Sequence, residues 1–287
     1  MTTVTVWGGS SSTDWHTAAN WTNGVPTTSL IASIPSAPSN QPIMSSDGTA
    51  HALQLDSGAT LTGGSNITLY ITGESAGETD APPNGMAVNL DGAISGELSL
   101  NINYNNTTSV DLNATSGMIH DLTLNHASLL INSENTCELG GDLIITLGTF
   151  NANGNTLDVE GWISGNGTCA AAASTVDVNQ GISVKDLTSS GGSITTGNDL
   201  RPTNFTISGN PTVTAGDQLG GILTVGASNT PTIACKRLYS SFNCTSGNQG
   251  QSTITINATE PNSGPSRDLY FYNLTLGTGD FTTTQQV

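Results

Sequence analysis

A glycine recurs at a fixed interval in the middle of the chain. Gly141, Gly161, Gly181 and Gly221 are separated by 20, 20 and 40 residues, and each is followed closely by apolar residues. A unit of about 20 residues is too short to bury its own apolar face, but stacked copies bury a continuous core. The interval therefore predicts a repeat architecture, and the series slips by a few residues near Arg201.

Short runs that alternate between apolar and polar residues predict strands, because alternation puts the apolar side chains on one face. No apolar pattern of helical period extends beyond one turn. The runs are Leu53–Leu55, Ile67–Ile71, Leu98–Ile102, Leu122–Leu124, Leu157–Val159, Val176–Val178, Ile222–Val225 and Thr253–Ile256. We expect an all-β chain that forms a parallel β-solenoid (β-helix). β-Sandwich domains are the alternative, but a sandwich gives no reason for glycines at a constant interval.

The same series predicts which side chains form the core. If the apolar residues after each glycine point inward, then Leu143, Ile145, Ile163, Ile182 and Ile222 are buried.

Charge is scarce and one-sided. The 287 residues include 5 basic and 22 acidic ones, which gives a formal net charge of −17. Such a chain cannot neutralise a run of phosphates or an anionic membrane surface, so we expect neither nucleic acid nor membrane as a partner. No apolar stretch is long enough to span a bilayer, and the N-terminus lacks the pattern of a signal peptide.

Residues 1–48 differ in composition from residues 49–287. They hold three of the four tryptophans and four of the 11 prolines. Because a solenoid needs a cover over its first strands, we predict an N-terminal cap or attachment module over 1–48 and a β-solenoid over 49–287. The phrase 272–277 reads as the start of a repeat that Val287 leaves incomplete, so we expect a further domain or another chain at that end.

Two phrases carry a resemblance to known proteins. The segment 142–167, with Gly148–Leu157 reading GTFNANGNTL, resembles the repeats of right-handed parallel β-helix proteins on bacterial surfaces and in phage fibres. The opening is similar to a Trp-rich module at the start of such proteins, through Val6-Trp7-Gly8, Asp14-Trp15, Ala18-Ala19-Asn20-Trp21 and Gly24-Val25-Pro26. The resemblance implies an architecture and hardly any activity.

Two groups of residues are candidate sites. Trp7, Trp15 and Trp21 can form a stacking platform for a glycan, whereas buried core anchors are the alternative. Asp158 and Asp177 occupy equivalent repeat positions, with Glu160 nearby, and such an acidic ladder can supply an acid and a base for carbohydrate cleavage or bridge Ca²⁺. Solvated outward positions are the simpler interpretation of the ladder.

The cysteines and histidines show no pattern of a metal or cofactor site. Cys137, Cys169, Cys235 and Cys244 have no CxxC pairing and no histidine at zinc-finger spacing, so we predict no metal and no cofactor. We expect buried thiols, with Cys235 and Cys244 as the first pair to test for a disulfide.

These observations favour a structural and adhesive protein on the surface of a virion, such as a phage fibre or a capsid or tail decoration. The chain has a start Met without an export signal, few Lys and Arg, and many Ser, Thr and Asn. The N-terminal module then contacts other virion proteins, the solenoid associates as a homotrimer, and a host-surface glycan is the ligand. The alternatives are a secreted bacterial adhesin or surface-layer protein at the cell surface, and a polysaccharide lyase or hydrolase.

Overall fold

The computed structural model describes residues 3–73, 88–103, 110–114, 119–226, 229–239, 243–246, 254–258 and 274–276. The chain divides into two compact units, Met1–Asn151 and Ala152–Val287. In each unit the strands pair in parallel with strands of the next turn, which defines a β-solenoid and confirms the predicted fold class. Within the described residues, no helix is long and apolar enough to cross a membrane.

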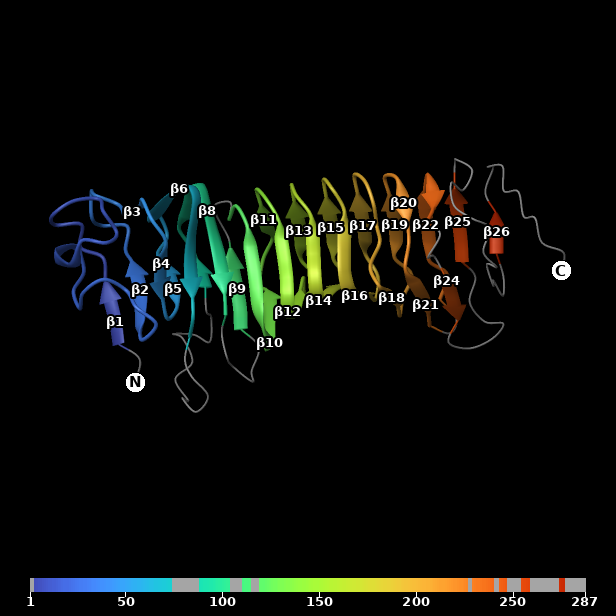
Figure 1. The fold of residues 1–287 in the computed structure, drawn as a ribbon, viewed down its shortest axis with the longest axis horizontal. Helices are drawn as coiled ribbons and strands as arrows, with labels where there is room; N and C mark the ends of the chain where they lie inside the picture. The colour runs from blue at the N-terminus through green and yellow to red at the C-terminus, as the bar shows by residue number, and fades with distance from the viewer. Residues whose placement is uncertain are drawn as a thin grey trace. The chain divides into compact units, whose positions relative to one another are not determined.

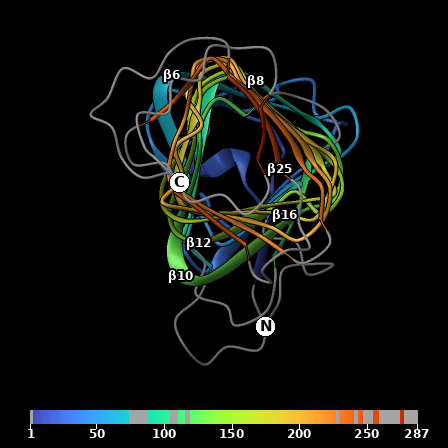
Figure 2. The same cartoon turned by 90° about the vertical axis from the view of Figure 1, so that its right-hand side faces the viewer.

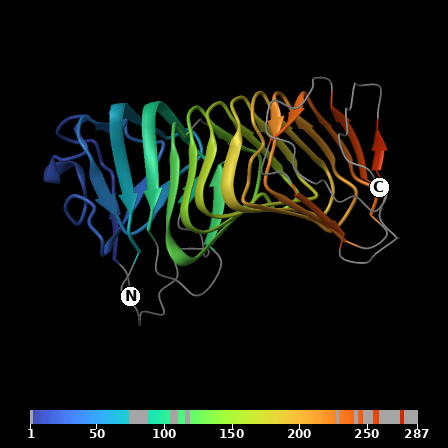
Figure 3. The same cartoon turned by 45° about the vertical axis from the view of Figure 1, so that its right-hand side comes forward.

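The first unit begins with β1 (Thr3–Val6) and a short 3₁₀ helix, η1 (Ala18–Asn20). One series of parallel strands runs β1-β2-β5-β7-β9-β10-β12, while β6 pairs with β3, β4 and β8, and β8 pairs with β10. Figure 3 shows these strands, from blue to green, following one another in chain order. Their bounds are β2 (Leu30–Ile34), β3 (Ile43–Met44), β4 (Gly48–Ala50), β5 (Leu53–Leu55), β6 (Thr60–Ile71), β7 (Val88–Leu90), β8 (Ala93–Ile102), β9 (Val110–Ala114), β10 (Leu122–Ser133), β11 (Cys137–Leu139) and β12 (Leu143–Asn151).

The core of the first unit consists of columns, by which we mean side chains at equivalent positions of successive strands. One column joins Leu69, Leu100, Leu122 and Leu143, and the next joins Ile71, Ile102, Leu124 and Ile145. All eight side chains are completely buried. The predicted burial of Leu143 and Ile145 is therefore confirmed, because parallel pairing in register places like side chains on top of one another.

In the second unit two parallel series alternate along the chain. One runs β14-β16-β18-β21-β24, the other runs β13-β15-β17-β19-β22-β25-β26, and β20 pairs with β23. Figure 1 shows the labelled strands side by side, and Figure 2 shows from the end that successive turns follow nearly the same outline. Their bounds are β13 (Thr156–Val159), β14 (Ile163–Ala172), β15 (Thr175–Val178), β16 (Ile182–Ser189), β17 (Ser193–Thr196), β18 (Asn204–Ile207), β19 (Thr212–Ala215), β20 (Gln218–Leu219), β21 (Ile222–Val225), β22 (Thr232–Cys235), β23 (Arg237–Leu238), β24 (Asn243–Ser246), β25 (Ile254–Ala258) and β26 (Leu274–Leu276).

The columns of the second unit confirm two further core predictions. Ile163 pairs with Ile182, and the same column continues through Leu200, Leu219 and Leu238. Ile163 and Ile182 are completely buried. A second column contains Leu157, Val176, Ile194, Val213 and Ile233, all completely buried.

The prediction for Ile222 is wrong. Its side chain is 41% exposed, and its neighbour Leu223 is buried at 1%. The pairing of β18 with β21 places Leu223 beside Phe205, which is itself buried, and thereby turns Ile222 outward. The cause is the turn length: side-chain hydrogen bonds between neighbouring turns join residues 18, 19 or 20 apart, so a strict interval of 20 drifts out of register.

The glycine series fails at the same place. A Cβ atom on Gly181 would lie 2.4 Å from Asp199 O, whereas one on Gly221 would lie 1.8 Å from Pro202 O. The two glycines therefore occupy different corners of the solenoid, although close approach of a neighbouring turn requires glycine at both.

The Trp-rich segment is continuous with the first unit. β1 pairs with β2, and β2 pairs with β5, so residues on both sides of position 48 share one sheet. The predicted division into 1–48 and 49–287, and the capping or attachment role of 1–48, stay predictions. The predicted incomplete last repeat falls mostly outside the described residues, which end with β26.

The thiols that the structure describes are buried and free. Cys137, Cys169 and Cys235 are not in disulfides, which agrees with the expected buried thiols, so Cys235 forms no disulfide with Cys244, the first pair to test. Its physical reason is the topology: Cys235 lies on β22, which pairs with β25, whereas Cys244 lies on β24, which pairs with β21 in the other series. Burial raises the pKa of Cys169 to about 12, and burial together with the Glu138 carboxylate raises the pKa of Cys137 to about 12.

Candidate functional site

The three N-terminal tryptophans form one aromatic cluster. The rings of Trp7 and Trp21 meet edge to face with centroids 5.0 Å apart, and those of Trp15 and Trp21 do so at 4.8 Å. Their exposed fractions are 1% for Trp7, 0% for Trp15 and 5% for Trp21. A sugar needs an exposed ring face to stack on, so the structure supports the alternative of buried core anchors.

Asn20 organises the loop that carries this cluster. Its Oδ1 accepts hydrogen bonds from the backbone N–H groups of Ser11 and Ser12, at 2.9 and 3.0 Å. Its Nδ2 donates to Asp14 O at 3.0 Å, and the residue is 1% exposed. No sequence pattern identifies the structural role of this residue, because buried asparagines have no pattern of their own.

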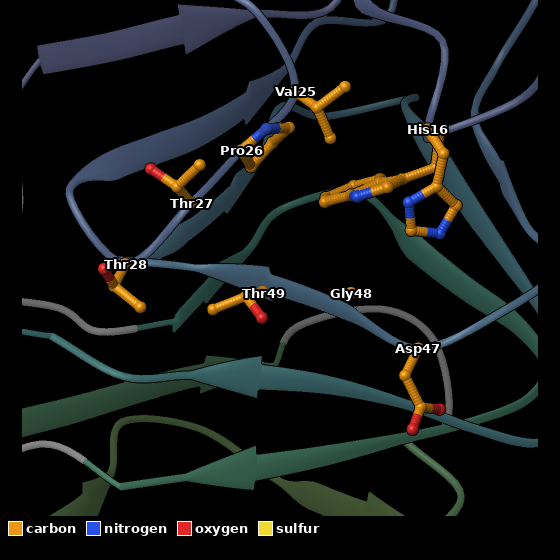
Figure 4. Close-up of a pocket in the computed structure, with 9 residues that line it drawn as sticks. His16, Val25, Pro26, Thr27, Thr28, Asp47, Gly48 and Thr49 are labelled. Atoms are coloured by element: carbon orange, nitrogen blue, oxygen red, sulfur yellow. The ribbon is translucent and has the colours of Figure 1, made fainter.

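A cavity of about 360 Å³ lies beside Trp15 in the first unit (Figure 4). Three separate segments form its walls: the loop after β1, the loop before β2, and the start of β4. The lining residues are Trp15, His16, Val25, Pro26, Thr27, Thr28, Asp47, Gly48 and Thr49. Of these, sequence reasoning singled out only Trp15 as a candidate, since the three segments are far apart in the chain.

Hydrogen bonds hold the polar wall of the cavity in place. Asp47 Oδ1 accepts from the backbone N–H of Thr68 at 2.9 Å. The buried His51 donates from Nδ1 to Thr28 O at 3.1 Å, which fixes the loop before β2. His16 Nε2 lies 3.0 Å from Ser46 Oγ. This contact connects the rim of the cavity to the residues that follow β3.

Asp14 stabilises the segment that presents Trp15 and His16. Its carboxylate accepts from the backbone N–H of His16 at 3.1 Å and from the Thr17 hydroxyl at 2.8 Å. The hydrogen bond from His16, followed by that from Thr17, lowers the pKa of Asp14 below its usual value. Asp14 therefore remains ionised and keeps this turn closed at neutral pH.

In the second unit the structure places the acidic ladder on an exposed sheet face. Asp158 on β13 lies directly opposite Asp177 on β15, and both side chains are exposed. Glu160 follows β13 in the turn, where its Oε2 accepts from Asn179 Nδ2 at 3.0 Å. The two aspartates thus stand side by side, about 4.8 Å apart along the sheet, while Glu160 is engaged by a neighbouring turn.

The acidic ladder belongs to a larger regular array. The same outward face carries a hydroxyl column, formed by Thr156, Thr175, Ser193, Thr212 and Thr232. Two residues further along each strand, a mixed column contains Asp158, Asp177, Thr195, Thr214 and Ala234. The strands pair without register shifts, so the columns repeat at about 4.8 Å across strands and about 6.6 Å along them. None of the five hydroxyl groups of the hydroxyl column bonds to another described residue.

Fold and sites together define a class: a parallel β-solenoid with a columnar aliphatic core, a buried aromatic cluster at its start and a regular polar exterior. A family model described as a domain of unknown function (DUF8693) matches residues 6–82, which include the aromatic cluster and the whole cavity. Neither the comparison with curated proteins nor that with solved structures gives a match.

Proposed function

We propose that the chain is a structural and adhesive surface protein whose solenoid presents a regular polar exterior to a host-surface glycan. The observation that carries the proposal is the outward face of β13, β15, β17, β19 and β22. There the hydroxyl column repeats without bulges over a fully buried aliphatic core. Repeated weak contacts along a rigid surface add up to useful avidity, which is the energetic basis of adhesion.

We further propose a place on a virion, as a phage fibre or as a capsid or tail decoration. The N-terminal region then contacts other virion proteins, and the solenoid associates as a homotrimer. The near absence of Lys and Arg supports an exposed location, because it removes most cleavage sites of trypsin-like proteases. Mass spectrometry of purified virions tests the location, and light scattering of the purified chain tests the trimer.

Adhesion itself is tested on the outward face. We expect the purified chain to bind immobilised polysaccharide from the host surface, and the double variant Thr212→Val and Thr214→Val to bind more weakly. Valine keeps the shape and strand preference of threonine but removes the hydroxyl. Thr206→Val, on β18 of the other series, is the matched control. Equal binding by the double variant and the control would contradict a role for this face.

Two alternative functions are distinguished by experiments on the same virions and the same host polysaccharide. A bacterial adhesin or surface-layer protein would be recovered from cell surfaces and not from virions. A polysaccharide lyase or hydrolase would release new reducing ends from the polysaccharide, and Asp158→Asn and Asp177→Asn would abolish the release. The direct pairing of these two aspartates is the observation that keeps the cleavage alternative open.

A further inference from the structure

Trp15 differs from its two aromatic neighbours in its hydrogen bonding. Trp7 Nε1–H donates to Asn40 O at 2.7 Å, and Trp21 Nε1–H donates to Trp15 O at 2.8 Å. Trp15 Nε1 is buried and has no acceptor among the described residues. Because an unpaired buried donor destabilises a fold, this N–H group points to an acceptor from outside the chain.

The unpaired N–H group lies at the wall of the cavity. Trp15 and Gly48 both line it, and a Cβ atom on Gly48 would lie 3.1 Å from Trp15 Nε1. The same Cβ atom would lie 2.6 Å from Met44 Cε, so close packing against Met44 and the Trp15 indole requires glycine at position 48.

The rest of the wall combines apolar and accepting groups. Val25 and Pro26 provide a C–H surface on one side, and Figure 4 shows Thr49 and Asp47 on the opposite side. Asp47 uses Oδ1 for the N–H of Thr68, whereas its Oδ2 has no partner among the described residues. The cavity thus offers a donor, an acceptor and an apolar wall.

We propose that this cavity binds one neutral sugar residue, an inference that rests on the proposed adhesive function. A pyranose has an apolar C–H face for Val25 and Pro26, a ring or hydroxyl oxygen that accepts from Trp15, and a hydroxyl that donates to Asp47. The Asp47 carboxylate and the net charge of −17 disfavour uronic and sialic acids. The volume, at the lower end of the roughly 300–1,000 Å³ of ligand pockets, suits a single residue.

The test is a titration of the full chain with the methyl glycosides of glucose, galactose, mannose and N-acetylglucosamine, and with methyl glucuronide as the anionic probe. The Trp15 indole N–H signal in ¹⁵N NMR is the readout. We expect a saturable shift with at least one neutral glycoside and none with the glucuronide.

Three variants locate the site. Trp15→Phe removes the donor and Asp47→Asn weakens the acceptor, and we expect each to reduce affinity about tenfold or more, as the loss of one well-formed hydrogen bond requires. Asp47 is exposed, and asparagine keeps the oxygen that accepts from Thr68, so this variant folds. Trp7→Phe is the matched control: it shortens an equally buried indole in the same cluster, outside the cavity, and should leave affinity unchanged.

Each outcome decides the inference. It is overturned if none of the four neutral glycosides shifts the Trp15 signal at millimolar concentration, if binding persists in Trp15→Phe and Asp47→Asn, or if the glucuronide binds as well as the neutral probes. Adhesion of the same variants to host polysaccharide separates this inference from the proposed function. Undiminished adhesion by both cavity variants refutes the cavity alone, whereas sugar binding without any adhesion refutes the proposed function alone.

Discussion

Ile222 and Leu223 are adjacent apolar residues on one strand, and the register of β21 predicts very different costs for replacing them. Leu223 is 1% exposed and lies in register with Phe205, whereas Ile222 is 41% exposed. Removing a fully buried leucine side chain to alanine costs about 2–5 kcal/mol. We therefore expect Leu223→Ala to destabilise the second unit by about 3 kcal/mol.

The partial exposure of Ile222 sets a smaller cost. Full burial of an isoleucine side chain is worth about 1.5–3 kcal/mol, and Ile222 keeps only part of that burial, so Ile222→Ala should cost about 1 kcal/mol. The difference of about 2 kcal/mol corresponds to roughly 30-fold in the equilibrium constant for opening. Both variants replace an aliphatic residue by alanine on the same strand, so differences in strand preference largely cancel.

Hydrogen exchange of the β18 and β21 amides measures this difference, because it reports the local free energy of opening and does not require two-state unfolding of a solenoid. Denaturation by urea, followed by circular dichroism, provides the global comparison. Equal effects of the two variants, or a larger effect of Ile222→Ala, would refute the register of β21 and the core columns built on it.

Three further predictions concern other parts of the core and surface. Burial raises the pKa of Cys137 and Cys169 from 9.0 to about 12, so these thiols should resist iodoacetamide in the native protein at pH 8.5. The stability of the protein should fall as pH rises from 9 toward 12, because in that range the thiols ionise only in the unfolded chain. Rapid labelling of the native protein, detected by peptide mapping, would contradict this. Gly209→Ala should lower the free energy of unfolding, measured in urea, by about 3 kcal/mol, because its Cβ would lie 1.8 Å from a carbonyl oxygen of the neighbouring turn. Gly154→Ala should cost only about 1 kcal/mol, because Gly154 has a φ of +83° but open space around it. Asp177→Thr should raise stability by about 0.5 kcal/mol at low salt, because it removes a like-charge pair from adjacent strands, and a loss of stability would show that the pair is held by a bound cation.

Local patterns allowed most of the fold to be predicted from the sequence. Alternation within Leu98–Ile102, Leu157–Val159 and Val176–Val178 identified strands and their inward faces, because alternation is a property of each strand alone. Ile222 was placed wrongly because the glycine interval was followed there, whereas the alternation within β21 puts Leu223 and Val225 on the buried face and Ile222 with Thr224 on the other. The glycine interval fails because it depends on the corner lengths of the intervening turns, which no strict period records.

The candidate sites show the same distinction. Asp158 and Asp177 were predicted to be neighbours because they occupy equivalent positions in similar phrases. The cavity could not be predicted, because Val25, Asp47 and Thr49 meet only through the folding of three separate segments. The unpaired N–H of Trp15 could not be predicted either, since whether a buried indole finds an acceptor depends on the tertiary environment.

The unequal lengths of the solenoid turns have a consequence for how such a chain can change over generations. Neighbouring turns are joined across 18, 19 or 20 residues, yet the buried columns remain continuous. The corners therefore absorb gained or lost residues, at a cost that grows only slowly with loop length. An insertion within a strand would instead reverse the facing of every side chain after it. Corners can thus diversify in length and composition under selection, while the scaffold between them stays the same.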